Sequence, residues 1–243
     1  MTRYIQATLL AAGLLLATAM PAAAFRLIPI EMEFAPSGRG ATQIFRIEND
    51  TPNPIAVEIH ITPRSQGADG EDLPAERSED WIIFPEQLVL EPNQNQSVRV
   101  QWTGDANPSH ELAFRLVAEQ LDVDIGRPPS QGGQVRLLVQ YKASLYVVPP
   151  DARPAINVVE AGPHQLSDGV VMLVRVRNDG TAHRILKDPT LTMEAGGRSV
   201  SIPAERLGGL AGENILPGVT RDFLLPWPEG LPVGPLKGRL SLP

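Results

Sequence analysis

The 243-residue sequence contains no cysteine. Thiol chemistry and cysteine-ligated metals are therefore excluded, and without disulfides the stability of the chain has to come from packing. Basic residues are also in deficit, because 21 Lys and Arg stand against 28 Asp and Glu, giving a formal net charge of −7. A nucleic acid is an unfavourable partner for such a chain, since binding to phosphates requires a surplus of positive charge.

Long apolar runs are confined to the N-terminus. Arg3 is followed by the apolar segment ATLLAAGLLLATAM and then by small residues that include Ala22 and Ala24. A charged start, a short apolar run and an A-x-A pattern are typical of a secretory signal peptide, and the run is too short for a membrane span of about 20 residues. We expect residues 1–24 to be removed, leaving an exported chain from Phe25 that has no membrane span.

No segment shows a helical period. From residue 26 onward, β-branched and aliphatic runs alternate with Pro, Gly, Asn and Asp, which is the pattern of β-sandwiches. The proline-rich passage 149–156 cannot continue a central strand, so we predict an all-β fold with two tandem β-sandwich domains, residues 25–150 and 151–243. The expected strands are 26–33, 42–48, 55–62, 81–84, 97–102, 111–121, 134–148, 170–178, 184–194, 198–203, 220–227 and 236–242.

The two halves of the chain show a weak internal repeat. One strand ends in Asn49-Asp50 and another ends in Asn178-Asp179-Gly180, and both endings suit tight turns. We interpret this as two sandwiches of related plan.

A catalytic or metal-binding constellation is not found. His60, His110, His164 and His183 are far apart in sequence, and HELAF lacks the second histidine of a zinc-protease helix. The acidic run GADGED, residues 67–72, lacks the ligand spacing of an EF-hand and is expected to be a solvated loop. The sequence thus predicts no cofactor, no metal and no enzyme, although a carbohydrate-active sandwich with two carboxylates across a groove stays open.

The stretch VRLLVQY is the best candidate for a binding strand. Val135, Leu137, Val139 and Tyr141 alternate along one side of the expected strand, while Leu138 adds an apolar group to the other side. An edge strand of this kind can pair with another polypeptide. The alternative is a central strand whose side chains fill their own sandwich.

Several segments resemble the periplasmic chaperones of the chaperone–usher pilus assembly pathway. In the family's order along essentially the whole mature chain, they are WIIFPEQLVLEPNQNQSVRVQW, AFRLVAEQL, VRLLVQYKASLYVVP, VRVRNDGTAHRI and ILPGVTRDFLLP. The resemblance implies two immunoglobulin-like domains with an inter-domain cleft. It also implies a periplasmic, non-enzymatic chaperone that completes a pilus subunit by donor-strand complementation and delivers it to an outer-membrane usher.

The resemblance also assigns residues. Val135, Leu137 and Val139, with Tyr141 next in the alternation, are expected to enter the subunit's groove, where each aliphatic side chain would contribute about 1.5 to 3 kcal/mol. The loop before this strand is short, as in the family's short-loop members. Whether a second copy caps the free strand in a self-capped oligomer stays open.

A carboxylate anchor is the second implied feature. The family binds the subunit's terminal carboxylate with two basic residues, and here Lys142 stands in the last strand while Glu31 occupies the position of the first-strand arginine. A carboxylate at Glu31 would repel the subunit's terminus. Arg115 resembles the basic residue of a divergent branch and is the expected replacement, since a guanidinium suits a carboxylate. The alternative is that Arg115 is a surface residue paired with a neighbouring Glu.

A second function class stays open at this point. The same sandwiches could build a secreted adhesin or a structural coat component. Such a protein should carry an incomplete domain or a ligand pocket, whereas this chain is expected to hold full sets of strands.

Overall fold

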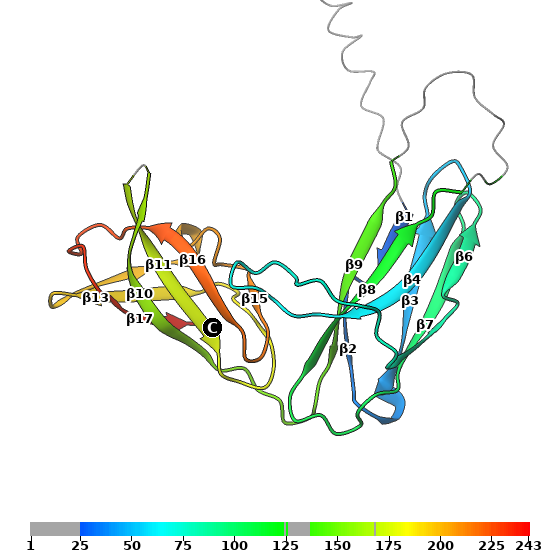
Figure 1. Ribbon diagram of the computed structural model, residues 1–243, viewed down its shortest axis with the longest axis horizontal. Helices are drawn as coiled ribbons and strands as arrows, with labels where there is room; N and C mark the ends of the chain where they lie inside the picture. The colour runs from blue at the N-terminus through cyan, green and yellow to red at the C-terminus, as the bar shows by residue number, and fades with distance from the viewer. Residues whose placement is uncertain (1–24, 124, 126–136, 168) are drawn as a thin grey trace, which may run out of the picture.

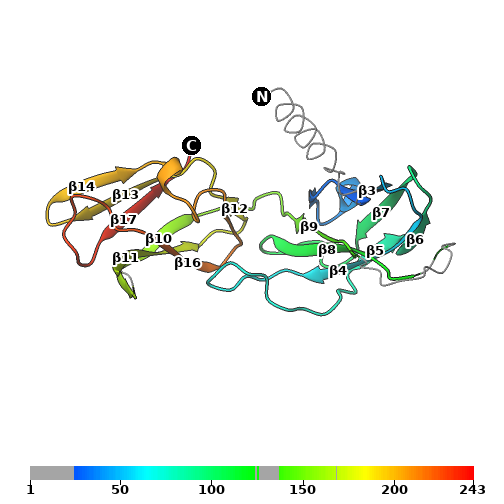
Figure 2. The ribbon, with the colours of Figure 1, turned by 90° about the horizontal axis from the view of Figure 1, so that it is seen from above.

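The computed structural model describes residues 25–123, 125, 137–167 and 169–243. Two β-sandwiches follow one another along the chain, and both views show two bodies joined by a short connection (Figures 1 and 2). The predicted all-β fold with two tandem sandwiches is confirmed. The expected signal peptide and Val135 lie outside the described residues. Within the described part of the chain, no helix has the length and apolarity needed to cross a bilayer.

The first sandwich consists of a four-stranded and a five-stranded sheet. The four-stranded sheet has the order β1 (Phe25–Ile28), β3 (Thr42–Asn49), β7 (Asn95–Trp102) and β5 (Trp81–Phe84). The five-stranded sheet has the order β2 (Glu31–Phe34), β9 (Gln140–Val147), β8 (Leu112–Gln120), β4 (Ile55–Pro63) and β6 (Gln87–Leu90). The 3₁₀ turn η2 (Gly38–Ala41) leads into β3.

Alternating residues of these strands build the first core. Its aromatic centre is Trp81, whose ring lies edge-on to the rings of Phe34, Trp102 and Phe114, with centroid distances of 4.9, 5.0 and 5.2 Å. Such edge-to-face pairs add about 0.5 to 1.5 kcal/mol each to the area that they bury. Because the chain has no cysteine and so no disulfide, packing of this kind is the source of stability in the core.

The second sandwich is smaller and has its own hydrophobic core. One sheet has the order β10 (Ile156–Leu166), β11 (Gly169–Asn178) and β16 (Thr220–Pro226), and another has the order β14 (Arg198–Ile202), β13 (Thr190–Ala195) and β17 (Lys237–Ser241). A two-stranded pair, β12 (Arg184–Ile185) with β15 (Asn214–Ile215), and the 3₁₀ turn η3 (Ala204–Arg206) complete it.

One buried asparagine recurs in each sandwich. The Asn49 side chain donates to the carbonyls of Asn53 and Leu90, at 2.9 and 3.0 Å. Asn178 donates in the same way to carbonyls four and 37 residues further on, and both side-chain oxygens accept an N–H from the second residue after the asparagine. Because a buried amide must be hydrogen-bonded, each asparagine ties a turn to a distant strand. The weak repeat in the sequence therefore reflects an asparagine with the same structural role in both sandwiches.

Some predicted strand boundaries are wrong. The expected strand 26–33 is divided at Pro29, which lacks a backbone N–H, and its halves β1 and β2 belong to different sheets. The expected strand 134–148 is shorter, since residues 137–139 are not in a strand and β9 begins at Gln140. The expected strand 184–194 is likewise divided into β12 and β13.

Three strands were missed, the shortest of which is β15. The strand β6 lies between the expected strands 81–84 and 97–102, where no strand was predicted. The strand β10 contains Gly162 and Pro163, which depress strand propensity. It tolerates the proline because it is an edge strand, at which a missing donor costs no ladder hydrogen bond.

Candidate functional site: the open edge of β9 and the guanidinium cluster

The strand β9 is only half covered on one side. It pairs with β8 along its whole length, whereas β2 pairs with it only from Ser144 onward. The N–H of Gln120 donates to the carbonyl of Val139 at 3.0 Å, and the N–H of Ser144 donates to that of Ile30 at 2.9 Å. Since the direction alternates along an antiparallel strand, even-numbered residues of β9 point their backbone groups away from β8.

This alternation leaves an open edge. The backbone groups of Gln140 and Lys142 point to the side on which, within the described part of the chain, no strand pairs with them. An unpaired N–H and C=O row of this kind is the template on which another chain can add a strand.

The predicted donor residues have different environments. Leu137 is 78% exposed and lies just before β9, next to the exposed Leu138. Val139 and Tyr141 are half-buried and pack against the core of their own sandwich, where the Tyr141 ring lies edge-on to Phe25 at 4.9 Å. Of the described members of the predicted set, Leu137 is therefore the apolar side chain available to a partner.

A cluster of charged groups lies beside this edge. The two oxygens of the Asp72 carboxylate accept hydrogen bonds from Arg64 Nε at 2.9 Å and Arg115 Nε at 2.6 Å. The Nη1 group of Arg115 also donates to Ser144 Oγ at 2.6 Å, and that of Arg64 donates to the Tyr146 hydroxyl at 3.0 Å. We call Arg64, Asp72 and Arg115, with their partners Ser144 and Tyr146, the guanidinium cluster.

Electrostatics holds the carboxylate of this cluster ionised. Partial burial alone would raise the pKa of Asp72, but the hydrogen bonds and charges of Arg115 and Arg64 outweigh it and hold this pKa below its usual range. Burial raises the pKa of the Tyr146 phenol, so this hydroxyl is neutral. The cluster therefore contains two guanidinium charges and one carboxylate charge.

The two residues expected as the carboxylate anchor share a face. Arg115 lies opposite Ser144 in the β8–β9 ladder, and Lys142 lies opposite Val117, so the two cations are diagonal neighbours. Both line a pocket of about 380 Å³ together with Asp72. Arg115 is ion-paired with Asp72 and not with a neighbouring Glu, while Lys142 forms no ion pair with any acidic residue that the structure describes.

Sequence reasoning missed Arg64 and Asp72. Asp72 ends the acidic run that was expected to be a solvated loop; Ala68, Asp69 and Glu71 are exposed as expected, but Asp72 is half-buried. A bridge between Gln66 and Asp72 folds the segment back on itself, which returns Asp72 to Arg64. The local sequence contains an arginine and an aspartate on either side of a glycine-containing turn, but pairing across that turn is decided by the contacts of the segment.

The same segment reaches the second sandwich. We call residues 64–72 the strap; in Figure 1 the cyan connection that contains it extends towards the other body. The N–H of Asp222 donates to the carbonyl of Ala68 at 2.8 Å. Gln66 donates to the carbonyl of Asn214 and accepts from the N–H of Leu216, both at 3.2 Å. Backbone and amide groups thus tie the strap to the second domain.

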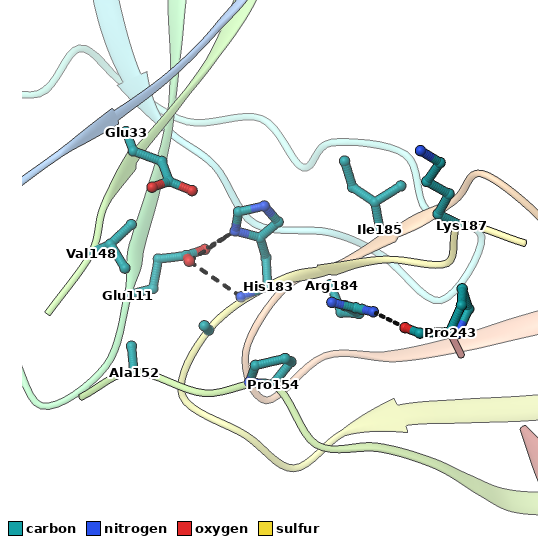
Figure 3. Close-up of a pocket in the computed structure, with 11 residues that line it drawn as sticks. Glu33, Glu111, Val148, Ala152, Pro154, His183, Arg184, Ile185, Lys187 and Pro243 are labelled. Atoms are coloured by element: carbon teal, nitrogen blue, oxygen red, sulfur yellow. Dashed lines mark hydrogen bonds and ion pairs between the residues drawn. The ribbon is translucent and has the colours of Figure 1, made fainter. Parts of the chain in front are cut away.

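A second contact joins the domains directly. Glu111, which is 3% exposed, accepts hydrogen bonds from the backbone N–H of His183 at 3.2 Å and from its ring Nδ1 at 2.8 Å (Figure 3). The imidazole stacks on Tyr146 with a centroid distance of 3.9 Å. The Tyr146 hydroxyl accepts a hydrogen bond from Asn214 at 2.8 Å, so the guanidinium cluster and the domain contact share this tyrosine.

A pocket of about 500 Å³ lies at this domain contact (Figure 3). Residues of both sandwiches line it, among them Glu33 and Glu111 from the first and Arg184 and Lys187 from the second. The predicted inter-domain cleft is therefore present. No group of three or more His, Asp or Glu side chains in the described ranges is placed to hold a metal ion.

Comparison with known proteins gives the fold. No protein-family model and no curated protein matches the chain. Among solved structures, the CsuC–CsuE chaperone–tip adhesion subunit complex of Acinetobacter baumannii aligns with a TM-score of 0.56 and 14% identity over 86% of this chain and 90% of that chain.

The class 5 fimbriae chaperone CfaA aligns with a TM-score of 0.55 and 14% identity over 90% of this chain and 100% of that chain. A chaperone–tip adhesin complex of CFA/I fimbriae gives a TM-score of 0.55 and 15% identity, over 91% and 100% of the two chains. The chain has the fold of fimbrial chaperones. The expected pair of immunoglobulin-like domains is confirmed at the level of this fold, which spans nearly all of the described residues.

Proposed function

We propose that the protein is a non-enzymatic chaperone that binds pilus subunits by adding its β9 edge to their incomplete sandwich. The observation that supports this most directly is the open edge at Gln140 and Lys142, preceded by the exposed Leu137. The fimbrial-chaperone fold adds support, because one solved structure that shares it is a chaperone in complex with a tip adhesion subunit.

The open edge and the exposed leucine have different roles in the proposed binding. Backbone pairing at Gln140 and Lys142 sets the register of the added strand, and the Leu137 side chain enters the apolar groove. Burying that side chain contributes about 1.5 to 3 kcal/mol. Val139 and Tyr141 pack against the core of their own sandwich and hold the strand in place. Val135, the remaining member of the predicted set, lies outside the described residues.

The anchor completes the proposed site. Arg115 and Lys142 line one pocket on the same sheet face, and we assign them the terminal carboxylate of the subunit. Glu31 pairs in register with Ser144, and Arg115 Nη1 reaches the same serine, so the guanidinium brings positive charge to a position flanked by Glu31. This geometry supports Arg115 as the replacement for the missing first-strand arginine.

We infer the same compartment and pathway that the sequence indicates. Residues 1–24 act as a cleaved signal peptide, the mature protein works in the periplasm, and it delivers its subunit to an outer-membrane usher. Mass measurement of the protein from a periplasmic fraction should give a chain that begins at Phe25. A chain that retains residues 1–24 would contradict the export step.

Co-expression with a pilus subunit encoded beside the gene tests the binding role. Wild-type protein should co-purify with the subunit, and Leu137→Glu should weaken the complex by at least about 30-fold, because about 2 kcal/mol of burial is lost. Leu224→Glu is the matched control, since Leu224 is an exposed leucine of the second domain. An intact complex with Leu137→Glu would refute the role of β9, whereas an intact complex with Arg115→Ala would refute only the anchor.

A further inference from the structure

The carboxylate of Asp72 already occupies the site assigned to a subunit's terminus. Each of its two oxygens accepts the Nε–H of one guanidinium, at 2.9 Å from Arg64 and 2.6 Å from Arg115. This is the arrangement in which an external carboxylate would bind between two arginines. A role for Asp72 in binding rests on the proposed function, in which Arg115 receives such a carboxylate.

The donors of Arg115 limit how a second carboxylate can bind. A guanidinium offers two bidentate edges, one that uses Nε and one that uses both Nη groups. Asp72 takes Nε, and Nη1 donates to Ser144 Oγ at 2.6 Å. An incoming carboxylate can therefore take the Nε edge only when Asp72 leaves it.

The charges of the site favour an exchange of one carboxylate for another. Arg64 and Arg115 together carry two positive charges against the one negative charge of Asp72, and Lys142 adds a third positive charge on the pocket wall. The side chain of Arg64 is only 7% exposed. Departure of Asp72 without a replacement would leave this buried charge without its carboxylate partner, which is costly, so the open site is the less populated state.

The strap allows Asp72 to leave without unfolding a sheet. Asp72 belongs to a connection between β4 and β5 and lies in no strand; it is linked to Gln66 only by an isolated bridge. Beyond this bridge, Ala68 is hydrogen-bonded to Asp222 of the second domain. Movement of Asp72 therefore acts on a segment that also contacts the second domain.

We propose that Asp72 is an internal carboxylate that closes the Arg64–Arg115 site in the free protein and is displaced by the terminal carboxylate of a bound subunit. It thereby sets the affinity of the anchor. A site that is open in about one molecule in ten binds about tenfold more weakly than a permanently open one.

Binding of a small carboxylate to the full-length mature protein tests this directly. The probe is N-acetylalanine, which carries the terminal carboxylate of a polypeptide, and its dissociation constant is measured by NMR titration. Asp72→Asn should bind it about tenfold more tightly than wild type, because a neutral amide competes more weakly for a guanidinium.

Asp69→Asn is the matched control. It removes the same charge from the same strap, but the Asp69 carboxylate accepts the backbone N–H of Glu71 at 3.0 Å and contacts no guanidinium within the described residues. Its affinity for N-acetylalanine should stay within about twofold of wild type, because an exposed charge is screened by salt. If Asp72→Asn binds no better than Asp69→Asn, including the case in which neither binds, the inference is overturned.

A wild-type measurement covers the case in which Asp72→Asn does not fold. The Nε–H resonances of Arg64 and Arg115 both report the hydrogen bond to Asp72. Displacement should shift both resonances in parallel during the titration, because Arg64 and Arg115 both lose their hydrogen bond to Asp72. A shift at Arg115 alone means that Asp72 stays, and this result overturns the inference. Neither arm uses a subunit, so failure of the proposed chaperone role in co-expression is a separate result.

Discussion

Removing the hydroxyl group of Tyr146 should destabilise the protein measurably. This hydroxyl accepts hydrogen bonds from Arg64 at 3.0 Å and from Asn214 at 2.8 Å, while the ring stacks on His183. Tyr146→Phe retains the ring and removes one acceptor from two part-buried donors, Arg64 Nη1 and Asn214 Nδ2. We expect a loss of about 2 to 4.5 kcal/mol in the free energy of unfolding, because a hydrogen bond from a charged donor contributes about 1.5 to 3 kcal/mol and a neutral one about 0.5 to 1.5 kcal/mol.

Urea unfolding at neutral pH, followed by tryptophan fluorescence, measures this loss. Tyr141→Phe is the matched control, because Tyr141 lies on the same strand and its hydroxyl forms no hydrogen bond within the described residues. The control should stay within about 0.5 kcal/mol of wild type. If Tyr146→Phe is no less stable than the control, the hydroxyl does not tie the guanidinium cluster to the second domain, and the reasoning is refuted.

Two further predictions concern the strap. The pKa of Asp72 is lowered in the folded protein, because its guanidinium partners outweigh the effect of burial. Its ion pairs therefore stabilise the fold at pH values above the unfolded pKa of about 3.9. This stabilisation is lost as the pH falls through the lower pKa of the folded state. In urea titrations, the stability difference between wild type and Asp72→Asn should thus be largest near pH 7 and shrink below about pH 4; a difference that does not change with pH would contradict the assignment. Gly70→Ala should detach the strap, because the added Cβ would lie 1.8 Å from Nη2 of the buried Arg221, and exchange of the Asp222 amide should become faster. Gly197→Ala, with a similarly positive φ but no atom within 4 Å of the added carbon, should leave that amide unchanged.

Local sequence patterns were sufficient for much of the fold. The strands expected at 42–48, 81–84 and 97–102 differ from β3, β5 and β7 by at most two residues at any end. In these segments, alternation of apolar and polar residues matches one buried and one exposed face, and turn-forming residues lie at both ends. Two of the failures were at prolines, Pro29 and Pro189, where a local pattern does not say which sheet the next residues join.

The site was only partly predictable for a related reason. Arg115 and Lys142 could be selected because the segments that contain them resemble those of a known family, and the structure places both on one face of neighbouring strands. Arg64 and Asp72 lie in a connection without periodicity, and their contact depends on the strap folding back on itself at the bridge between Gln66 and Asp72. No spacing rule in the sequence relates such residues.

The order of apolar and turn-forming residues determined that this chain forms two β-sandwiches, and the absence of cysteine determined that packing and not disulfides stabilises them. Pairing of the stretch around Leu137 with another chain stays a prediction from the sequence. Only the tertiary structure decided that β2 pairs with β9 from Ser144 onward and leaves the earlier part of the β9 edge open, and that Asp72 lies between two guanidiniums. The physical reason is the distance along the sequence over which each feature is decided. Side-chain alternation is a property of neighbouring residues, whereas the end of a β-ladder and the partner of a charged side chain depend on segments that meet only after the chain has folded.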